Sequence, residues 1–190
     1  VTVGSIFTGI GGFDLGFERA GFTIAWQVEI DPFCRSVLAK HWPDVPRFGD
    51  IRECGAHNLT TVDVLCGGFP CQPHSLAGRR LATADTRDLW PQFDRLIREI
   101  RPRWVVAENV PGILSSEAGR FFGAILGDLA ASGYDAEWDC IPASAVGAPH
   151  RRDRVWLVAY PKGVTFGAGL RSGGSFAERW GRLGDGHGTR

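Results

Sequence analysis

Short apolar runs alternate with amphipathic segments along most of this chain. The runs are rich in β-branched and aromatic residues, as in buried strands, and the amphipathic segments repeat apolar residues every three or four positions, as in helices. Strands that alternate with helices predict an α/β fold with a mostly parallel sheet and helices on both faces. The predicted strands are Val3–Phe7, Thr23–Val28, Val62–Cys66, Trp104–Ala107 and Val155–Tyr160, and the predicted helices include Leu89–Ile100 and Phe121–Leu129.

Length and composition indicate a single globular domain. The chain has 190 residues, of which 44% are hydrophobic and 22% charged, which excludes disordered, collagen-like and disulfide-scaffold proteins. No apolar run reaches the roughly 18 residues that span a bilayer, and the N-terminus lacks a signal-peptide pattern, so we expect a cytoplasmic protein. The predicted strands and helices all lie within residues 1–160. Residues 161–190 include nine glycines and no lasting periodicity, as in a tail or linker.

Cysteine and charge content exclude some kinds of site and leave others open. The five cysteines are odd in number and form no CxxC pair, so neither a disulfide framework nor a metal site is predicted. Acidic and basic residues balance at 21 each, so a nucleic-acid partner would need a local basic surface. Nearly all basic residues are arginines, which either serve phosphate contacts or reflect codon bias.

A glycine-rich turn follows the first predicted strand. Residues Phe7–Gly12 precede an amphipathic helix, so backbone N–H groups and a helix N-terminus would face a ligand there. The full GxGxxG spacing is absent, and the turn either binds a nucleotide-like cofactor or is only structural. Glu29 ends the next strand, where a carboxylate can accept both ribose hydroxyls. Asp31, just before Pro32, is predicted to cap a helix instead. A third acid, Asp50, follows a short extended segment.

Cys71 lies in the glycine-rich turn that follows the Val62–Cys66 strand. The carboxyl end of a parallel strand is where open α/β sheets place their sites. The thiol is either a nucleophile, if positive charge or a helix N-terminus lowers its pKa, or an ordinary free thiol. The second interpretation is favoured for the four other cysteines, which lie within or next to apolar patterns: Cys34, Cys54, Cys66 and Cys140.

Two further segments carry charge near predicted strand ends. Residues 72–88 combine Gly, Pro and Ser with three arginines, as in either a loop that closes over an anionic ligand or a solvated loop. Glu108 lies at the carboxyl end of the Trp104–Ala107 strand, where it could donate or accept a proton. The run His150–Arg154 could bind phosphate or orient Glu108, or it is a surface charge run.

Three ordered motifs resemble the DNA (cytosine-5)-methyltransferase family. They are Pro-Cys-Gln at 70–72, within Gly-Gly-Phe-Pro-Cys-Gln-Pro, Glu-Asn-Val at 108–110, and Arg-Arg-Asp-Arg at 151–154, and the likeness runs from Val3 to Tyr160. The resemblance implies a Rossmann-like fold that uses S-adenosylmethionine. Residues 1–160 would then form the catalytic and cofactor-binding domain, and residues 161–190 a Gly-rich tail or the start of a missing recognition region. It also implies methyl transfer to C5 of a cytosine flipped out of double-stranded DNA, through a covalent adduct with Cys71.

The resemblance further implies the role of each site residue. Glu108 would hold N3 and the exocyclic amine of the cytosine, and Leu89 would close the adenine pocket. The residues implied in catalysis are Pro70, Cys71, Gln72, Glu108, Arg152 and Arg154. Those implied in cofactor binding are Phe7, Gly9, Gly11, Gly12, Glu29, Ile30, Asp50, Ile51, Phe69, Pro70 and Leu89, and a DNA-binding loop would include Ser75, Arg79, Arg80 and Arg87.

The chain also departs from the family pattern. His74 replaces the usual phenylalanine and His150 the usual glutamine, and no target-recognition region is apparent beyond Tyr160. The chain could therefore be inactive alone, as a truncated product or as one subunit of a split enzyme whose partner supplies recognition. A non-catalytic cofactor-binding module is a further alternative, although the presence together of Cys71, Gln72, Glu108 and Arg152 argues against it. An RNA cytosine methyltransferase of the same family is compatible with the motifs. A nicotinamide dehydrogenase on the same fold would leave Pro70–Gln72 without a role.

Overall fold

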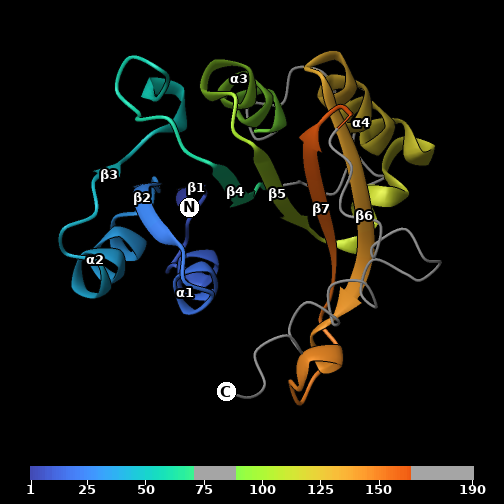
Figure 1. Cartoon of the computed structure of the whole chain (residues 1–190). Helices are drawn as coiled ribbons and strands as arrows, with labels where there is room; N and C mark the ends of the chain where they lie inside the picture. The colour runs from blue at the N-terminus through green and yellow to red at the C-terminus, as the bar shows by residue number, and fades with distance from the viewer. Residues whose placement is uncertain (71–88, 164–190) are drawn as a thin grey trace, which may run out of the picture.

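One twisted sheet organises the part of the protein that the structure describes. This computed structural model describes residues 1–70 and 89–163, and in these ranges seven strands form a single sheet in the order β3-β2-β1-β4-β5-β7-β6 (Figure 1). The strands are β1 (Thr2–Ile6), β2 (Thr23–Val28), β3 (Arg47–Phe48), β4 (Val64–Gly68), β5 (Trp104–Asn109), β6 (Tyr134–Pro142) and β7 (Asp153–Pro161).

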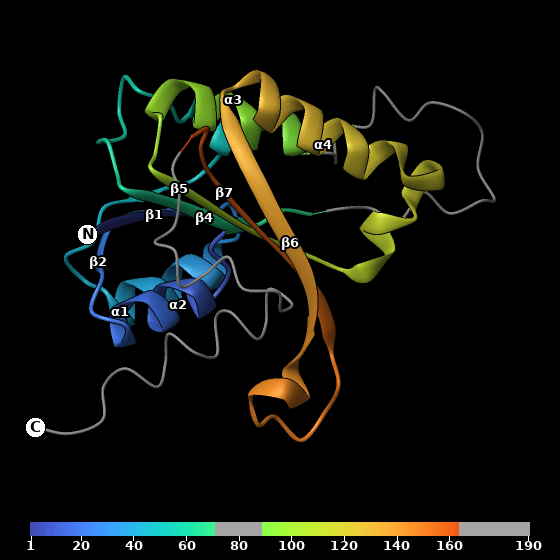
Figure 2. The same cartoon turned by 45° about the vertical axis from the view of Figure 1, so that its right-hand side comes forward.

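The predicted α/β fold with a mostly parallel sheet is confirmed. Strands β3, β2, β1, β4 and β5 run parallel, whereas β7 is antiparallel to both β5 and β6. Helices cover both faces: Figure 2 shows α1 and α2 against one face and α3 and α4 against the other. The helices are α1 (Gly12–Arg19), α2 (Pro32–His41), α3 (Trp90–Ile100) and α4 (Arg120–Ala131), with short 3-10 turns η1 (Ile51–Glu53), η3 (Pro111–Leu114), η4 (Ser116–Gly119) and η5 (Ala143–Val146).

The core has two layers because the central strands are buried on both faces. Apolar residues of α3 and α4 pack on one face of the sheet, and aromatic residues of α1 pack on the other. Strands with two buried faces are continuously apolar, which explains why they were predictable from the sequence. The first layer includes Leu65, Phe93, Leu96, Ile97, Val105 and Ile125, and the second includes Val3, Ile24, Val64 and Cys66 against Phe13 and Phe17.

The prediction of β4 was wrong by two residues. The strand runs from Val64 to Gly68 and not from Val62 to Cys66, so two glycines assigned to the turn belong to the strand. A Cβ atom at Gly67 would overlap the backbone oxygen of Ile6 on β1. The glycine therefore permits close approach of two strands. Because glycine is also common in turns, its presence in the sequence does not reveal which of the two roles it has.

Strand β6 was not predicted. Its sequence alternates acidic and apolar residues, and among the strands of the described ranges it pairs only with β7, at the edge of the sheet. Such a strand lacks the continuous apolar run that marks the central strands. The predicted domain boundary at residue 160 falls within β7, which ends at Pro161, and residues 164–190 lie outside the described residues. In the described part of the chain, no helix is long and apolar enough to cross a membrane.

Candidate active site

Many of the predicted site residues that the structure describes lie along one edge of the sheet. Because β1, β2, β4 and β5 run parallel, their carboxyl ends share an edge. This edge carries the glycine turn after β1, Glu29 after β2, Phe69 after β4 and Glu108 at the end of β5. Asp50 follows β3, the next strand along. The acids and the glycine turn therefore lie at the position that open α/β sheets use for ligands.

The glycine turn presents bare backbone at the start of α1. Gly9 and Gly11 have φ values of 57° and 91°, which L side chains rarely adopt. A Cβ atom at Gly11 would overlap the ring of Trp42, whereas one at Gly9 or Gly12 would meet open space. The turn therefore needs glycine for its conformation, and the open space at Gly9 and Gly12 lets a polar ligand approach the backbone beside a helix N-terminus.

Glu29 is fixed to the glycine turn. Its Oε2 accepts a hydrogen bond of 2.6 Å from the Gly9 N–H, and its Oε1 accepts one of 2.8 Å from the Asp31 N–H. Each carboxylate oxygen keeps a further lone pair, so the half-buried group can still accept from hydroxyls. The predicted cap is confirmed, since the Asp31 carboxylate accepts from the Cys34 N–H at 2.9 Å. Ile30, between the two acids, is exposed.

Asp50 and Ile51 form the turn beyond β3. The Asp50 carboxylate accepts from the Arg52 N–H at 2.9 Å and pairs with the Arg52 guanidinium at 2.8 Å, and these hydrogen bonds lower the pKa of Asp50. Ile51 is buried, and its carbonyl accepts a 2.9 Å bond from Arg95 of α3. Helix α3 therefore fixes this turn relative to the sheet.

Glu108 has the environment of a carboxyl group that can hold a proton. Its Oε1 lies 2.6 Å from Nε of Arg154 on β7, and both side chains are about one-quarter exposed. Burial raises the pKa of Glu108 more than the charges of Arg154 and Arg152 lower it. A Cβ atom at Gly68 would lie 2.9 Å from the Glu108 Oε2, so the carboxylate fits only because β4 has glycine there.

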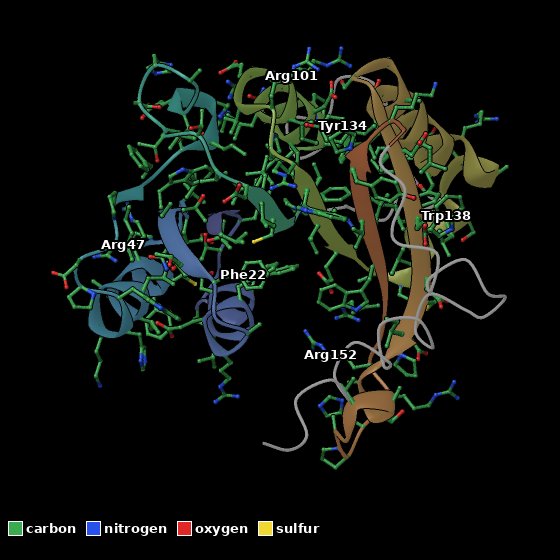
Figure 3. The ribbon with its side chains drawn as sticks, in the orientation of Figure 1. Phe22, Arg47, Arg101, Tyr134, Trp138 and Arg152 are labelled. Carbon is green, nitrogen blue, oxygen red and sulfur yellow. The ribbon has the colours of Figure 1, made fainter. Side chains whose placement is uncertain are left out.

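The two catalytic arginines predicted from the sequence differ in placement. Arg154 contacts Glu108 directly. Arg152 is exposed and has a φ of 39°, unusual for a residue with a side chain, and it acts on Glu108 only through its charge. Figure 3 shows Arg152 in the segment that leads from the 3-10 turn η5 into β7.

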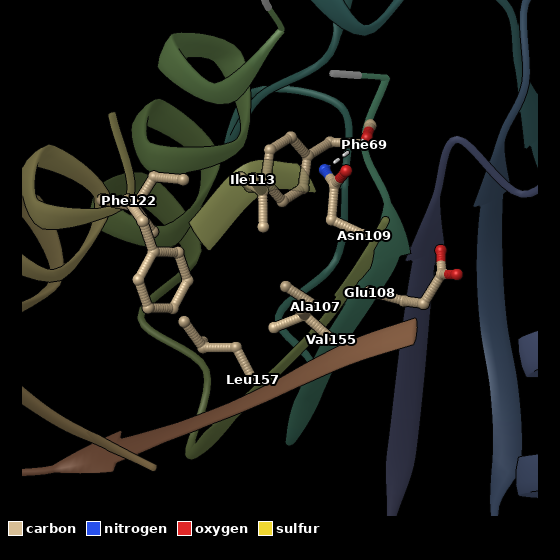
Figure 4. Close-up of a pocket in the computed structure, with 9 residues that line it drawn as sticks. Phe69, Ala107, Glu108, Asn109, Ile113, Phe122, Val155 and Leu157 are labelled. Carbon is tan, nitrogen blue, oxygen red and sulfur yellow. Dashed lines mark hydrogen bonds between the residues drawn. The ribbon is translucent and has the colours of Figure 1, made fainter. Parts of the chain in front are cut away.

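Asn109 is a site residue whose role the sequence did not reveal. Its buried Nδ2 donates a 2.9 Å hydrogen bond to the carbonyl of Phe69, drawn as the dashed line in Figure 4, and its Oδ1 accepts from the Val110 N–H at 2.8 Å. This bond joins the end of β5, next to Glu108, to the residue before Pro70. The Glu-Asn-Val motif was visible in the sequence, but the partner 40 positions away was not.

An aromatic cluster connects the glycine turn with the described residues on both sides of the segment that carries Cys71. Phe69 packs on Trp90 and Phe93 at centroid distances of 5.4 and 6.1 Å, and Phe7 lies 6.4 Å from Phe93. Leu89, half-buried, precedes α3, and its carbonyl accepts from the Phe93 N–H at 3.1 Å. The residues just before position 71 and just after position 88 therefore pack in the same aromatic cluster.

The cavity next to these strand ends is part of the core. It measures about 10 Å³ and is walled mainly by apolar side chains of β5, β7 and α4. In Figure 4 the Glu108 carboxylate points away from Phe122 and Leu157 and out of the group of apolar side chains. At this volume it could hold at most about one water molecule, so it is not a ligand pocket.

Several predicted residues lie outside the described residues. They are Cys71, Gln72, Ser75, Arg79, Arg80 and Arg87; Pro70, the last residue described before them, is exposed. Within residues 1–70 and 89–163, no group of three His, Cys, Asp or Glu side chains could hold a metal ion.

Comparison with known proteins decides the family. The sequence profile described as C-5 cytosine-specific DNA methylase matches residues 1–169. The chain belongs to this family. Members of the C-5 cytosine-specific DNA methylase family take the methyl group from S-adenosylmethionine and act through a covalent cysteine adduct. The expected family and the Rossmann-like methyltransferase fold are therefore confirmed.

Individual methylases support this assignment. The chain is 33% identical to the Type II methyltransferase M.NgoBI of Neisseria gonorrhoeae, over 85% of this chain and 51% of that protein. It is 35% identical to the Type II methyltransferase M.AquIA of Picosynechococcus, over 85% of this chain and 73% of that protein. The chain thus spans about half the length of M.NgoBI and three-quarters of M.AquIA.

Solved structures of methylases have the same fold. An E. coli prophage protein described as a DNA modification methyltransferase superposes with a TM-score of 0.73 at 30% identity, over 85% of this chain and 47% of that chain. DNMT2 of Spodoptera frugiperda superposes with a TM-score of 0.70, over 90% of this chain and 53% of that chain. Its identity of 21% supports a shared fold alone.

Proposed function

We propose that this chain is the catalytic and cofactor-binding part of a DNA (cytosine-5)-methyltransferase, acting in the cytoplasm. The observation that carries the proposal is the arrangement around Glu108. Arg154 orients its carboxyl group, and Asn109 ties the same strand end to Phe69, two residues before Cys71. A proton-holding carboxyl and a cysteine are thereby attached to neighbouring parallel strands, as attack on a cytosine requires.

The residues present fit S-adenosylmethionine. The open space at Gly9 and Gly12 lets a ligand reach the turn backbone, and Glu29 can accept from the ribose hydroxyls. The adenine would lie near Ile30, Asp50 and Ile51. Bound S-adenosylmethionine supplies a methyl group on a positively charged sulfur. The complete proposed set is Phe7, Gly9, Gly11, Gly12, Glu29, Ile30, Asp50, Ile51, Phe69, Pro70 and Leu89.

The proposed chemistry begins with the Cys71 thiolate. Its sulfur forms a bond to C6 of a flipped cytosine, and the electron pair of the C5–C6 double bond moves toward N3. Glu108 delivers its proton to N3, which neutralises the charge that develops on the ring and makes C5 nucleophilic. After C5 gains its methyl group, a base in the site or the solvent takes up the C5 proton and the S–C6 bond breaks, which restores the C5–C6 double bond and the thiolate. The N3 proton returns to the Glu108 carboxylate.

Electrostatics explain why Glu108 suits this role. A buried carboxyl whose pKa is raised can carry a proton to a base nitrogen, whereas an exposed one would already have lost it. Arg154 holds the group in place and stabilises the carboxylate that remains after proton transfer. Arg152, Gln72 and Pro70 complete the proposed catalytic set, and Ser75, Arg79, Arg80 and Arg87 the proposed DNA-binding loop.

Covalent trapping tests the reaction. The chain is incubated with S-adenosylmethionine and duplex DNA containing 5-fluorocytosine, which cannot lose a proton from C5, and the adduct is detected by mass. We expect an adduct that Cys71→Ser abolishes and Cys34→Ser leaves intact. An adduct that survives Cys71→Ser would overturn the assignment. The same assay with 5-fluorocytosine in RNA tests whether the substrate is RNA.

Cofactor binding has a separate test with a matched control. Glu29→Ala should weaken binding of S-adenosylhomocysteine by roughly 10- to 100-fold, because a charged hydrogen-bond acceptor is lost. Asp31→Ala removes the cap of α2 but not the proposed ribose contact, so it should lower stability by about 1 kcal/mol and leave affinity nearly unchanged. Equal affinity loss in both variants would contradict a ligand role for Glu29.

A second polypeptide that supplies target recognition is the partner we infer. Beside the proposed cofactor site, large apolar side chains are exposed on the glycine turn, α1 and α2: Ile10, Leu15 and Phe33. Exposed apolar residues grouped at a functional edge favour a covering surface. If the isolated chain binds S-adenosylhomocysteine but forms no adduct, it is a subunit or part that needs such a partner.

A further inference from the structure

A buried polar network lies beneath the cofactor turn and has no role in the chemistry above. Asp14 and Gln27 are 0% exposed, Ser5 is 1% exposed and Thr8 is 7% exposed. They come from α1, β2, β1 and the turn after β1, so four segments meet through polar side chains inside an apolar core. Because buried polar groups are costly unless satisfied, the hydrogen bonds of this network constrain the protonation state of its members.

Four oxygen–oxygen contacts connect the side chains of this network. Asp14 Oδ1 lies 3.1 Å from Ser5 Oγ, Ser5 Oγ lies 3.0 Å from Thr8 Oγ1, and Thr8 Oγ1 lies 3.1 Å from the carbonyls of both Val28 and Ser5. With Asp14 ionised, the Ser5 hydroxyl donates to Asp14, and the single Thr8 proton serves either Ser5 Oγ or the carbonyls but not both. A protonated Asp14 completes a series in which Asp14 donates to Ser5, Ser5 donates to Thr8, and Thr8 donates to the carbonyls.

The orientation of Gln27 is fixed independently. The Arg47 guanidinium, which can only donate, lies 3.4 Å from Gln27 Oε1, and Figure 3 shows Arg47 beside β2. The Gln27 amide must therefore turn its Nε2 toward Asp14, where it donates to Oδ1 at 2.8 Å. Asp14 Oδ1 thus accepts from Gln27 and, when protonated, donates to Ser5.

The surroundings of Asp14 also favour its neutral form. Its second oxygen, Oδ2, is buried without a hydrogen-bond partner, and in the described ranges Asp14 forms no ion pair. The titratable or charged neighbours are Glu18 on its own helix, Cys66 on β4 and, behind Gln27, Arg47 on β3. Burial raises the pKa of Asp14 and outweighs the hydrogen bonds from Gln27 and Ser5, which lower it.

We propose that Asp14 is a positioning residue of the cofactor site, acting as a neutral hydrogen-bond donor that fixes the glycine turn relative to Glu29. The series ends at Val28, one residue before Glu29, and the Thr8 N–H also donates to the Val28 carbonyl at 3.2 Å. Gly9, the next residue along, donates to Glu29. The inference rests on the proposed function, since it deepens the account of the same cofactor site.

Ionisation of Asp14 is tested by comparison with Asp14→Asn, which cannot ionise. A raised pKa means that the unfolded state releases this proton at lower pH than the folded state does, so stability falls as pH rises between the two pKa values. In that window, the unfolding equilibrium constant of the unmodified chain should rise, relative to Asp14→Asn, by up to about tenfold per pH unit. Urea unfolding of both proteins from pH 4 to 10 measures the ratio of their unfolding equilibrium constants. The effects of the other titrating groups cancel in this ratio.

The positioning role is tested by cofactor affinity. Ser5→Ala interrupts the series between Asp14 and Thr8 and should weaken binding of S-adenosylhomocysteine by roughly tenfold at pH 7. Ser36→Ala, which removes an exposed hydroxyl of α2 bonded to the Phe33 carbonyl, is the control and should have no effect. The affinity of the unmodified chain should also fall at alkaline pH relative to that of Asp14→Asn.

The outcomes separate this inference from the proposed function. A pH-independent ratio of unfolding constants would refute a neutral Asp14. Unchanged affinity in Ser5→Ala would refute the positioning role. If the unmodified chain binds no S-adenosylhomocysteine, the proposed function fails, while the unfolding experiment still decides the protonation state of Asp14.

Discussion

At the scale of single residues, Glu108 should give the reaction a recognisable pH dependence. Its raised pKa keeps the carboxyl protonated to higher pH than usual, so trapping should slow as the pH rises through that pKa. The Cys71 thiol acts in the opposite direction, because the thiolate fraction grows with pH. The pH–rate profile of trapping between pH 5 and 9 should therefore be bell-shaped.

Glu108→Gln should remove the falling arm of this bell. The rate should drop by about 10²- to 10⁴-fold, as for loss of a general acid, while the rising arm from Cys71 persists. Single-turnover trapping across the pH range measures both arms. A falling arm that persists in Glu108→Gln would assign it to another group.

Asn109 is expected to matter for both stability and catalysis. Asn109→Ala leaves the Phe69 carbonyl without its buried donor, which should lower the free energy of unfolding by about 1–3 kcal/mol. Adduct formation should slow as well, because Phe69 leads directly to Pro70 and Cys71. Urea unfolding and trapping measure the two effects. Asn58→Ala, an exposed amide bonded only within its own turn, should leave trapping unchanged.

At the scale of elements, two glycines near one helix should respond in opposite directions. Gly11 precedes α1 in a left-handed conformation and its Cβ would overlap Trp42, so Gly11→Ala should destabilise the fold by at least about 1–2 kcal/mol. Gly16 lies inside α1 facing open space, so Gly16→Ala should stabilise by about 0.5–1 kcal/mol. Thermal unfolding tests both, and equal effects would contradict the local reason given for Gly11.

For the whole molecule, the exposed apolar side chains beside the proposed cofactor site should make the isolated chain self-associate. Phe33 is 72% exposed on α2, so Phe33→Ser should change stability by less than about 0.5 kcal/mol yet reduce self-association in sedimentation experiments. Val146→Ser, at a comparably exposed site in η5, is the control and should have no effect. A chain that stays monomeric at all concentrations would argue against a partner that covers these side chains.

Local sequence patterns were enough to predict the α/β class, the central strands and the order of the motifs. The central strands β1, β2 and β5 were predictable because strands buried on both faces are continuously apolar. Helix α3 was predictable from the helical spacing of its apolar residues. The cap at Asp31 was equally readable, since capping depends on residues three positions apart. The likeness to cytosine methylases came from the motif sequences themselves.

Tertiary structure alone decided which distant residues meet. Asn109 hydrogen-bonds the Phe69 carbonyl, and Arg154 pairs with Glu108. Gly68 leaves room for the Glu108 carboxyl group, because the sheet register places these two positions side by side. The edge strand β6 also depends on its pairing with β7 and not on its own pattern. The state of Asp14 follows in the same way from partners on other segments, since a residue type does not specify its burial or its hydrogen bonds.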